Sequence, residues 1–387
     1  MSPNTDFDVI VIGSGPAGAT TARIAAERGL RVLLVDKKQE LGAPIQCSGA
    51  VSAHALGDTG VQPDDEYIAT PIYGFKVYDA NGAAETLDYR TLKPGEYNRS
   101  PLGYVVDRRR FDRYLTALAE RAGVEVWLKT EALEYHANGD GTANVLMKKF
   151  GQELTIRARV IVGADGLQSR VGKWAGLRTH IRLAELASCL QFVMDRVDTD
   201  GLLEIITGHE WAPGGYAWIF PRGRGYAEVG LGVARTLTGK DARWHLEHFI
   251  RHSFLAERLK DARVLEVQGG GVPLAAPLKQ QYADNVILVG DAARHVNPIT
   301  GGGIHTALRC GQIAGNFLGD FLPAGLPPDA ENLAEYQRRW MKELGEAMWK
   351  LYRLKREIFR QPTAERDRML YQTLAQYFSP RSEFRKV

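Results

Sequence analysis

The sequence has few cysteines, little net charge and no long hydrophobic run, and each of these absences excludes a class of protein. Its three cysteines, Cys47, Cys189 and Cys310, are too few and too scattered for a disulfide framework or a zinc site. A net charge of +3, without a clustered basic and aromatic ladder, does not suggest a nucleic-acid partner. We therefore expect a protein that binds neither a metal nor nucleic acid.

Hydrophobic residues are nowhere arranged in a run that could cross a bilayer. No stretch approaches the roughly 18 uninterrupted apolar residues of a spanning helix. The first residues contain no basic segment, apolar core and cleavage site in series, as a secretory signal would. We expect a cytoplasmic location, with contact at a membrane surface at most.

The composition is typical of a folded enzyme. A chain of 387 residues exceeds one ordinary domain, so about two or three are expected. With 44% hydrophobic and 25% charged residues, and without low-complexity segments, the chain can bury a large core.

The stretch "DFDVIVIGSGPAGATTARIAAERGLRVLLVD" predicts a strand, a tight turn, a helix and a second strand. Gly13, Gly15 and Gly18 form a GxGxxG turn, which allows a backbone to approach a pyrophosphate and to pack closely against a helix. That helix starts near Ala17, with its N-terminus facing the anion. Asp36, at the end of the second strand, is placed to bind a ribose hydroxyl. The segment therefore predicts a dinucleotide site.

Two later segments resemble further parts of a cofactor site. "RVIVGADGLQSRVG", residues 159–172, is a strand followed by a turn that includes Asp165. "NVILVGDAARHVNPITGGGIHTALRCGQIAG", residues 285–315, is a strand, then Gly290 and Asp291, then glycines that open a helix. In order and spacing, the three segments resemble the fingerprints of the glutathione-reductase-type FAD fold, in the branch that contains the aromatic hydroxylases. The resemblance implies an α/β fold with FAD as cofactor.

The same resemblance implies roles for individual residues around the flavin. Asp291 would accept a hydrogen bond from a ribityl hydroxyl, and the backbone N–H groups of Gly303 and Ile304 would face the N1 and C2=O edge from a helix N-terminus. Arg108, at the start of a predicted helix, would contact the FAD; the alternative is one solvated arginine among several. Ala132 lies where this fold brings backbone near the adenine.

On this resemblance the FAD domain is discontinuous. Alternating runs such as "LLEIITG", "YAWIFPRG" and "YAEVGLGVA" predict antiparallel strands between glycines and prolines. We expect a Rossmann-like FAD domain, a mainly antiparallel β substrate domain and a C-terminal helical region. The expected ranges are 1–70, 100–175 and 275–325 for the FAD domain, 71–99 and 176–274 for the substrate domain, and 326–387 for the helical region.

Residues 338–360 predict a basic amphipathic helix. They contain eight basic and three acidic residues, together with Trp340, Trp349, Tyr352 and Phe359. Interfacial aromatics on a basic helix suit an anionic membrane surface. The alternative is that the aromatics pack against the protein itself, and both interpretations stay open at this point.

The segment "PGGYAWIFP" carries a more specific resemblance. It fits the pattern PxxYxWxFP, which resembles the signature of the geranylgeranyl reductase family of flavoproteins. "VGLGV" after it, "PIQCSGAVS" near residue 47 and the third FAD segment are also similar to that family, over about residues 6–320. The family resemblance implies reduction of carbon–carbon double bonds in polyprenyl chains, with an isoprenoid lipid as substrate. The electron donor, NAD(P)H or ferredoxin, is left open.

The aromatic side chains of this segment are candidate substrate contacts. An isoprenoid tail offers no charge and no hydrogen-bonding group, so it must be held by shape and apolar area. Tyr216, Trp218 and Phe220 share one face of a strand and could supply a rigid wall. The same alternation is what an ordinary sheet core requires, so a purely structural role is the alternative.

The family resemblance also points to candidate catalytic residues. An isolated double bond is a poor hydride acceptor, so a proton must be supplied to its other carbon. Cys47 lies in the family's cysteine-containing stretch, and with Ser48 and Gly49 it is expected beside the flavin. Whether Cys47 donates the proton, orients the flavin or only packs stays open. Tyr216 is the second candidate donor.

Two other functions are compatible with the same fold. A flavin monooxygenase or halogenase would share the FAD fold, but halogenases carry a WxWxIP motif where this chain has Tyr216 and Phe220 at the variable ends. A non-catalytic prenyl-binding carrier would have no need of the intact GxGxxG, Asp36 and Gly290–Asp291 set. The difference from the halogenase motif and the intact cofactor residues both favour a reductase.

Overall fold

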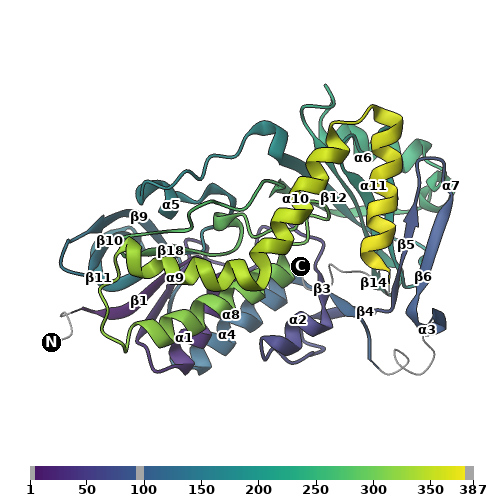
Figure 1. Ribbon diagram of the computed structural model, residues 1–387. Helices are drawn as coiled ribbons and strands as arrows, with labels where there is room; N and C mark the ends of the chain where they lie inside the picture. Colours follow the sequence, from purple (N-terminus) through teal and green to yellow (C-terminus); the bar gives the residue numbers. More distant parts are fainter. Residues whose placement is uncertain (1–4, 93–99, 380–387) are drawn as a thin grey trace.

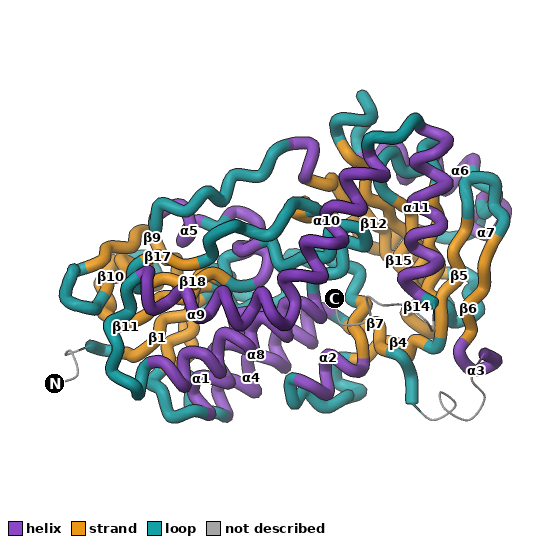
Figure 2. The backbone as a smooth tube through the Cα atoms, in the orientation of Figure 1, coloured by secondary structure: helices purple, strands orange, loops and turns teal. Residues whose placement is uncertain are grey.

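The computed structural model describes residues 5–92 and 100–379. Two sheets lie side by side, and helices of the C-terminal part run from one toward the other (Figures 1 and 2). The parts of the predicted domains in residues 1–4, 93–99 and 380–387 lie outside the described residues.

The first sheet has eight strands and holds the nucleotide motifs at its carboxyl edge. Its strand order is β17-β18-β11-β1-β2-β8, and β9 and β10 extend it as an antiparallel ribbon from β11. The β1, β2, β8, β11 and β18 strands are parallel, as buried apolar runs such as that of β1 favour. The bounds are β1 Phe7–Ile12, β2 Val32–Val35, β8 Glu125–Trp127, β9 Thr130–Ala137, β10 Ala143–Lys149, β11 Gln152–Gly163, β17 Tyr282–Ala283 and β18 Val286–Leu288.

Three helices pack together against this sheet: α1 (Pro16–Glu27), α4 (Arg108–Arg121) and α8 (Ile304–Phe321). Their apolar side chains form one buried cluster with β1 and β2. The cluster fixes the N-termini of α1 and α8 at the sheet edge where the predicted FAD residues lie. Short elements nearby are α5 Arg170–Trp174 and the 3₁₀ turns Gly166–Gln168 and Gly290–Ala293.

The second sheet has seven strands in the order β16-β12-β15-β14-β13-β5-β6. Every neighbouring pair is antiparallel except β5 and β13, which are parallel. Residues 74–88 supply β5 and β6, so the predicted hairpin joins this sheet. The bounds are β5 Gly74–Tyr78, β6 Ala84–Asp88, β12 Leu186–Asp195, β13 Leu203–Thr207, β14 Tyr216–Gly223, β15 Tyr226–Ala234 and β16 Arg263–Pro273.

One face of the second sheet is covered by helices that the strand pattern did not predict. α6 (Ala242–His252) packs Leu246 and Phe249 against Ile219 and Val229, with α7 (Ala256–Leu259) beside it. Residues 176–274 are therefore not only strands. Asp241 caps α6 by accepting a hydrogen bond from the N–H of Trp244, 2.8 Å away.

A small sheet and the C-terminal helices connect the two halves. β3 (Ala50–Ser52), β7 (Gly103–Val106) and β4 (Ile68–Ile72) form a three-stranded sheet, with α2 (Ala53–Asp58) after β3 and α3 (Tyr89–Leu92) after β6. The C-terminal helices pass along both halves (Figure 1). They are α9 Ala330–Trp340, the π-helical turn Met341–Gly345, α10 Glu346–Phe359 and α11 Thr363–Phe378.

The aromatic residues of the predicted basic helix pack largely against the protein. The Trp340 ring is fully buried and stacks on His295, with 4.4 Å between ring centroids. Tyr352 is buried, and its hydroxyl donates to Glu185. Within the described residues, no helix is long and apolar enough to span a bilayer.

A buried carboxylate in the second sheet makes stability depend on pH. Glu228 on β15 is 1% exposed, pairs with Arg222 through Oε1, and has no partner for Oε2 among the described residues. Burial raises the pKa of Glu228 to about 7. Because its folded-state pKa is raised, its contribution to stability is lost as the pH rises toward and through 7.

We expect Glu228→Gln to gain stability relative to the wild type between about pH 5 and pH 8, by up to about 3 kcal/mol, since one pKa unit corresponds to about 1.4 kcal/mol. Urea unfolding at several pH values measures this difference. The matched control is Glu257→Gln, because the Glu257 side chain is 83% exposed. A difference that is independent of pH would contradict the prediction.

Candidate active site

The GxGxxG turn forms an open cradle at the N-terminus of α1. Gly13 has φ +107°, and a methyl group added there would lie 2.3 Å from the carbonyl oxygen of Ala164. Gly18 is equally confined, because a methyl group added there would lie 1.9 Å from the carbonyl oxygen of Gly13. Gly15 has an ordinary extended backbone, and an added methyl group would have no atom within 4 Å. Gly15 also caps α1 without a side-chain hydrogen bond, so the first N–H groups of the helix face this opening.

Asp36 is held beside the cradle by backbone donors. Its carboxylate accepts hydrogen bonds from the N–H groups of Ser14 at 2.9 Å and Lys38 at 2.8 Å. These two bonds orient the side chain and leave further lone pairs for a ribose hydroxyl. Thr130 N–H donates to the Asp36 carbonyl, which places Ala132, two residues further along β9, near the same strand end.

The three predicted fingerprints meet at one place. Ala164, next to Asp165, touches the first glycine turn, and a methyl group on Gly290 would lie 2.9 Å from the Ala17 side chain. Asp165 accepts from the Val171 N–H at 3.0 Å through Oδ2, while its buried Oδ1 has no partner among the described residues. An unpartnered buried acceptor is costly unless a ligand donates to it.

The start of α8 presents the third part of the site. Gly303 caps this helix without a side-chain hydrogen bond, so the N–H of Ile304 at the helix start is directed at the site. A methyl group on Gly303 would lie 3.7 Å from Asp291 Oδ1. Burial raises the pKa of Asp291, whereas the Arg108 charge opposes that shift.

Arg108 is paired and not a solvated surface arginine. Its Nε and Nη2 donate to the two Asp112 oxygens at 3.0 and 3.1 Å. Burial alone would lower the pKa of Arg108, but the Asp112 carboxylate, with a further contribution from the Cys47 sulfur, outweighs burial and raises it. The guanidinium therefore stays charged beside Cys47 and within range of Asp291.

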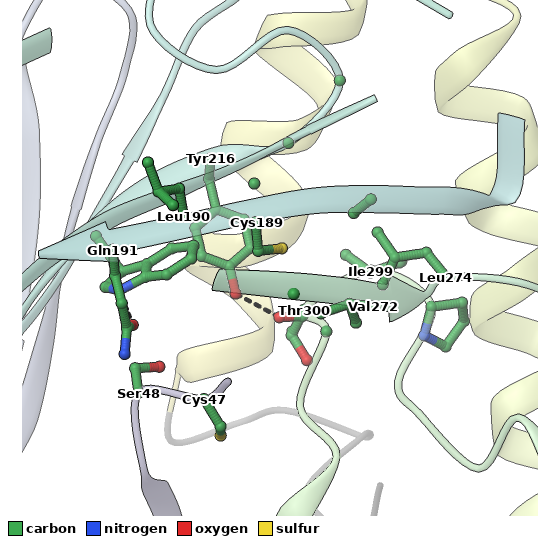
Figure 3. A pocket seen from close by; sticks show the side chains of 18 of the residues that line it. Cys47, Ser48, Cys189, Leu190, Gln191, Tyr216, Val272, Leu274, Ile299 and Thr300 are labelled. Atoms are coloured by element: carbon green, nitrogen blue, oxygen red, sulfur yellow. Dashed lines mark hydrogen bonds between the residues drawn. The ribbon is translucent and has the colours of Figure 1, made fainter. Parts of the chain in front are cut away.

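Cys47, Ser48 and Gly49 form a turn between the cofactor residues and a pocket. Gly49 has φ +77°, and its N–H donates to Cys47 Sγ at 3.4 Å. Cys47 and Ser48 lie on a loop across the pocket from Tyr216 (Figure 3). The thiol is thus placed near a backbone N–H, an arginine and the pocket interior.

The pocket contains about 950 Å³ of space, part of which is open to solvent. Its walls are mainly apolar and come from the second sheet, the Cys47 turn, the loop before α8 and the C-terminal helices. The lining includes Cys47, Ser48, Cys189, Leu190, Tyr216, Trp218, Phe220, Val272, Leu274, Ile299, Thr300, Lys355, Ile358, Phe359 and Leu370.

The aromatic segment on β14 divides its side chains between two faces. Ala217 and Ile219 are fully buried against the α6 side, whereas Tyr216, Trp218 and Phe220 face the pocket. The centroids of neighbouring rings are 5.9 and 6.2 Å apart. The three rings therefore form a continuous apolar wall and are not only a sheet core.

Tyr216 is less suited to donating a proton than the sequence suggested. Its hydroxyl donates to the carbonyl oxygen of Thr300 (Figure 3). Burial raises the pKa of the phenol well above its ordinary value, so it is a weak acid here. The geometry favours a positioning role, in which Tyr216 fixes the turn that precedes α8.

Three residues that line the pocket belong to no sequence motif that indicated them: Gln191, Gln268 and Cys189. Gln191 Nε2 donates to Gln268 Oε1 at 2.5 Å, and Gln191 Oε1 accepts from Trp218 Nε1 at 3.2 Å, which fixes the indole ring. Cys189 lines the same pocket as Cys47, but burial raises the pKa of its thiol to about 12. Only the strand alternation on β12 could have indicated that Cys189 and Gln191 face the same side.

Comparison with known proteins agrees with this arrangement. The FAD binding domain family matches residues 6–312. A digeranylgeranylglycerophospholipid reductase from Methanothrix thermoacetophila is 38% identical over 341 residues, 87% of this chain and 84% of the relative. A digeranylgeranylglycerophospholipid reductase 2 from Methanopyrus kandleri is 39% identical over 343 residues, 88% of this chain and 83% of the relative.

Solved structures give the same fold. A geranylgeranyl bacteriochlorophyll reductase-like protein from Thermoplasma acidophilum superimposes with a TM-score of 0.87 at 29% identity, covering 98% of this chain and 92% of that protein. A flavin-dependent brominase has a TM-score of 0.72 at 19% identity, covering 98% of this chain and 96% of the brominase, and shows the fold alone.

The fold and the site define an FAD-dependent oxidoreductase, because the glycine cradle, the unpartnered Asp165 oxygen and the two helix N-termini fit that cofactor. The chain belongs to the geranylgeranyl reductase family of flavoproteins. The predicted fold class, cofactor and family are confirmed. The family assignment also favours a reductase over a monooxygenase, a halogenase or a prenyl carrier.

Proposed function

We propose that this protein reduces the carbon–carbon double bonds of geranylgeranyl chains carried by a glycerophospholipid. The observation that carries the proposal is the apolar pocket, which runs from the aromatic wall of β14 to the Cys47 turn and the loop before α8. The names of the archaeal relatives support the substrate class. FAD, when bound, supplies the hydride and is reloaded by an external electron donor.

The pocket residues hold the chain and exclude water. An isoprenoid gains about 25 cal/mol for each Å² of apolar surface it buries, so rigid rings provide affinity without polar contacts. Trp218 is fixed by Gln191, and Tyr216 is fixed by Thr300. These two anchored rings would hold a double bond in a constant position.

Cys47 is the proposed proton donor to the second carbon of the double bond. When Sγ gives up its proton, a thiolate remains beside the Gly49 N–H and the charged Arg108 guanidinium. The N–H dipole and the guanidinium charge both attract the negative charge left on sulfur by the proton transfer. The proposal therefore gives Arg108 a positioning and electrostatic role and Cys47 the proton transfer.

We also propose that the protein meets the membrane surface along β16, the outer strand of the second sheet. Val264, Leu265 and Val267 on this strand are 47, 57 and 48% exposed. The same strand continues into Gln268 and the glycines that line the pocket. An exposed apolar edge next to the pocket suits the transfer of a lipid chain.

Chemically reduced protein, incubated with a digeranylgeranyl glycerophospholipid, is expected to add two hydrogens for each double bond reduced. Mass spectrometry of the lipid measures the gain, and fully oxidised protein is the control. A parallel reaction with a nicotinamide, oxygen and a phenol tests the monooxygenase alternative. Hydroxylated phenol with unchanged lipid would overturn the proposed function.

A further inference from the structure

A lysine lies in the wall of the apolar pocket. Lys355 on α10 is 7% exposed, and its Nζ donates to the carbonyl oxygen of Leu274. The ammonium lies 5.3 Å from the centre of the Phe359 ring, which lines the pocket with Ile358. A pocket that binds only a hydrocarbon chain has no need of a buried cation in its wall.

Lys355 has an acidic neighbour, Glu185, but no directly paired carboxylate within the described part of the chain. Across residues 5–92 and 100–379, Lys355 forms no ion pair with a carboxylate. Glu185 is the acidic group that acts on it, but Glu185 is already paired with Arg182 and accepts from the Tyr352 hydroxyl. Buried lysines are rarely left without a counter-ion, so an anionic ligand is the natural partner.

A second cation faces the same loop. Arg294 donates to the carbonyl oxygens of Ala276 and His180, and its buried Nε has no partner among the described residues. Lys355 and Arg294 therefore bind carbonyls only two residues apart, at Leu274 and Ala276. Of these two cations, Lys355 lines the pocket and provides its positive end, while Glu185 acts on both.

Leu274 lies between Lys355, at the positive end of the pocket, and the turn at Thr300 and Gly301 that precedes α8. A methyl group on Gly301 would lie 3.7 Å from the Leu274 side chain, whereas the Leu274 carbonyl faces Lys355. A lipid with its polar group at Lys355 would pass Leu274 before its chain reaches the turn at Thr300 and Gly301. The order of groups matches a molecule with one anionic end and a long apolar chain.

We infer that Lys355, with Arg294 nearby, binds the phosphate at the polar end of the lipid substrate. The inference rests on the proposed function and names its headgroup specificity. A phosphate monoester offers several charged acceptor oxygens to the Lys355 ammonium. The uncharged glycerol lipid would leave the ammonium without a counter-ion.

The test compares two lipids, digeranylgeranylglycerol and its phosphate ester. Lys355→Met is expected to raise KM for the phosphate ester about 10- to 100-fold, the range for one charge-assisted contact, with kcat nearly unchanged. Turnover of the uncharged lipid should not change. Lys355→Arg should restore the low KM, and Lys350→Met, at an exposed position of the same helix, is the matched control.

The pH dependence of KM for the phosphate ester distinguishes phosphate binding by Lys355 from a purely structural role of this residue. Burial lowers the pKa of Lys355 to about 8, although Glu185 opposes the shift. The wild-type KM for the phosphate ester should therefore rise as the pH passes through about 8, while Lys355→Arg should show no such rise. This comparison also serves if Lys355→Met does not fold.

Inorganic phosphate distinguishes the headgroup from a site for free anions. We expect it to compete weakly with the phosphate ester in the wild type and not in Lys355→Met. Equal loss of turnover on both lipids in Lys355→Met, or no change on either, would overturn the inference. Failure of the wild type to reduce either lipid would instead overturn the proposed function.

Discussion

Gly15→Ala is expected to weaken FAD binding about 10- to 100-fold, or about 1.4–2.8 kcal/mol, while the protein stays folded. The added methyl group meets no protein atom within 4 Å, and the backbone at Gly15 is ordinary and extended. The methyl group would instead occupy the space through which a pyrophosphate approaches the N-terminus of α1. Titration of apoprotein with FAD, followed by flavin fluorescence, measures the loss.

Two other glycines give the comparison its controls. Gly57→Ala also adds a methyl group in open space but lies away from the site, so FAD affinity should not change. Gly13→Ala would push a methyl group into the Ala164 carbonyl and strain a positive φ, so it should destabilise the fold as well. Unchanged FAD affinity in Gly15→Ala would show that the cofactor does not approach this turn.

Cys47→Ala should slow the addition of hydrogens to the lipid by about 10²- to 10⁴-fold, the usual range for loss of a general acid. FAD should stay bound, because Cys47 lies on the pocket side of the cofactor residues. Single-turnover reaction of reduced protein with lipid, with the flavin spectrum recorded in parallel, measures both quantities.

Cys189→Ala is the matched control for Cys47→Ala. Both thiols line the pocket, but Cys189 has its pKa raised to about 12 by burial, whereas Cys47 lies beside Arg108. Loss of Cys189 should therefore change the rate little. Equal rates for wild type and Cys47→Ala would remove Cys47 from the proton transfer and leave it a packing role.

The FAD-binding part was predictable because its structural requirements are met by residues that lie close together in the sequence. Gly13 needs a positive φ, and Asp36 must follow a strand that ends beside the turn, so chain order and spacing carry the information. The structure brings Asp165, Gly290 and Asp291 to the same edge, as the resemblance implied. The roles of these residues toward FAD stay predictions.

Other features depend on contacts that no local pattern contains. The Tyr216 hydroxyl bonds to Thr300, which is 84 residues away, so the sequence could not show that this proton is already engaged. Two other features were visible in the sequence pattern. Lys355 falls at a core position of the helical pattern Met348, Leu351, Tyr352 and Ile358. Asp241 stands directly before the apolar period of α6, where an N-cap residue is expected.

The far end of the pocket is built from α10 and α11, through Ile358, Phe359 and Leu370, whereas the matched FAD family ends at residue 312. The aromatic wall of β14 lies inside the matched region, whereas this part of the pocket wall lies outside it. Evolution can shorten, lengthen or recharge the slot by altering the last two helices, without disturbing the residues that hold the cofactor. Exchanging these two helices between family members would therefore change the pocket wall while leaving the matched FAD-binding region intact.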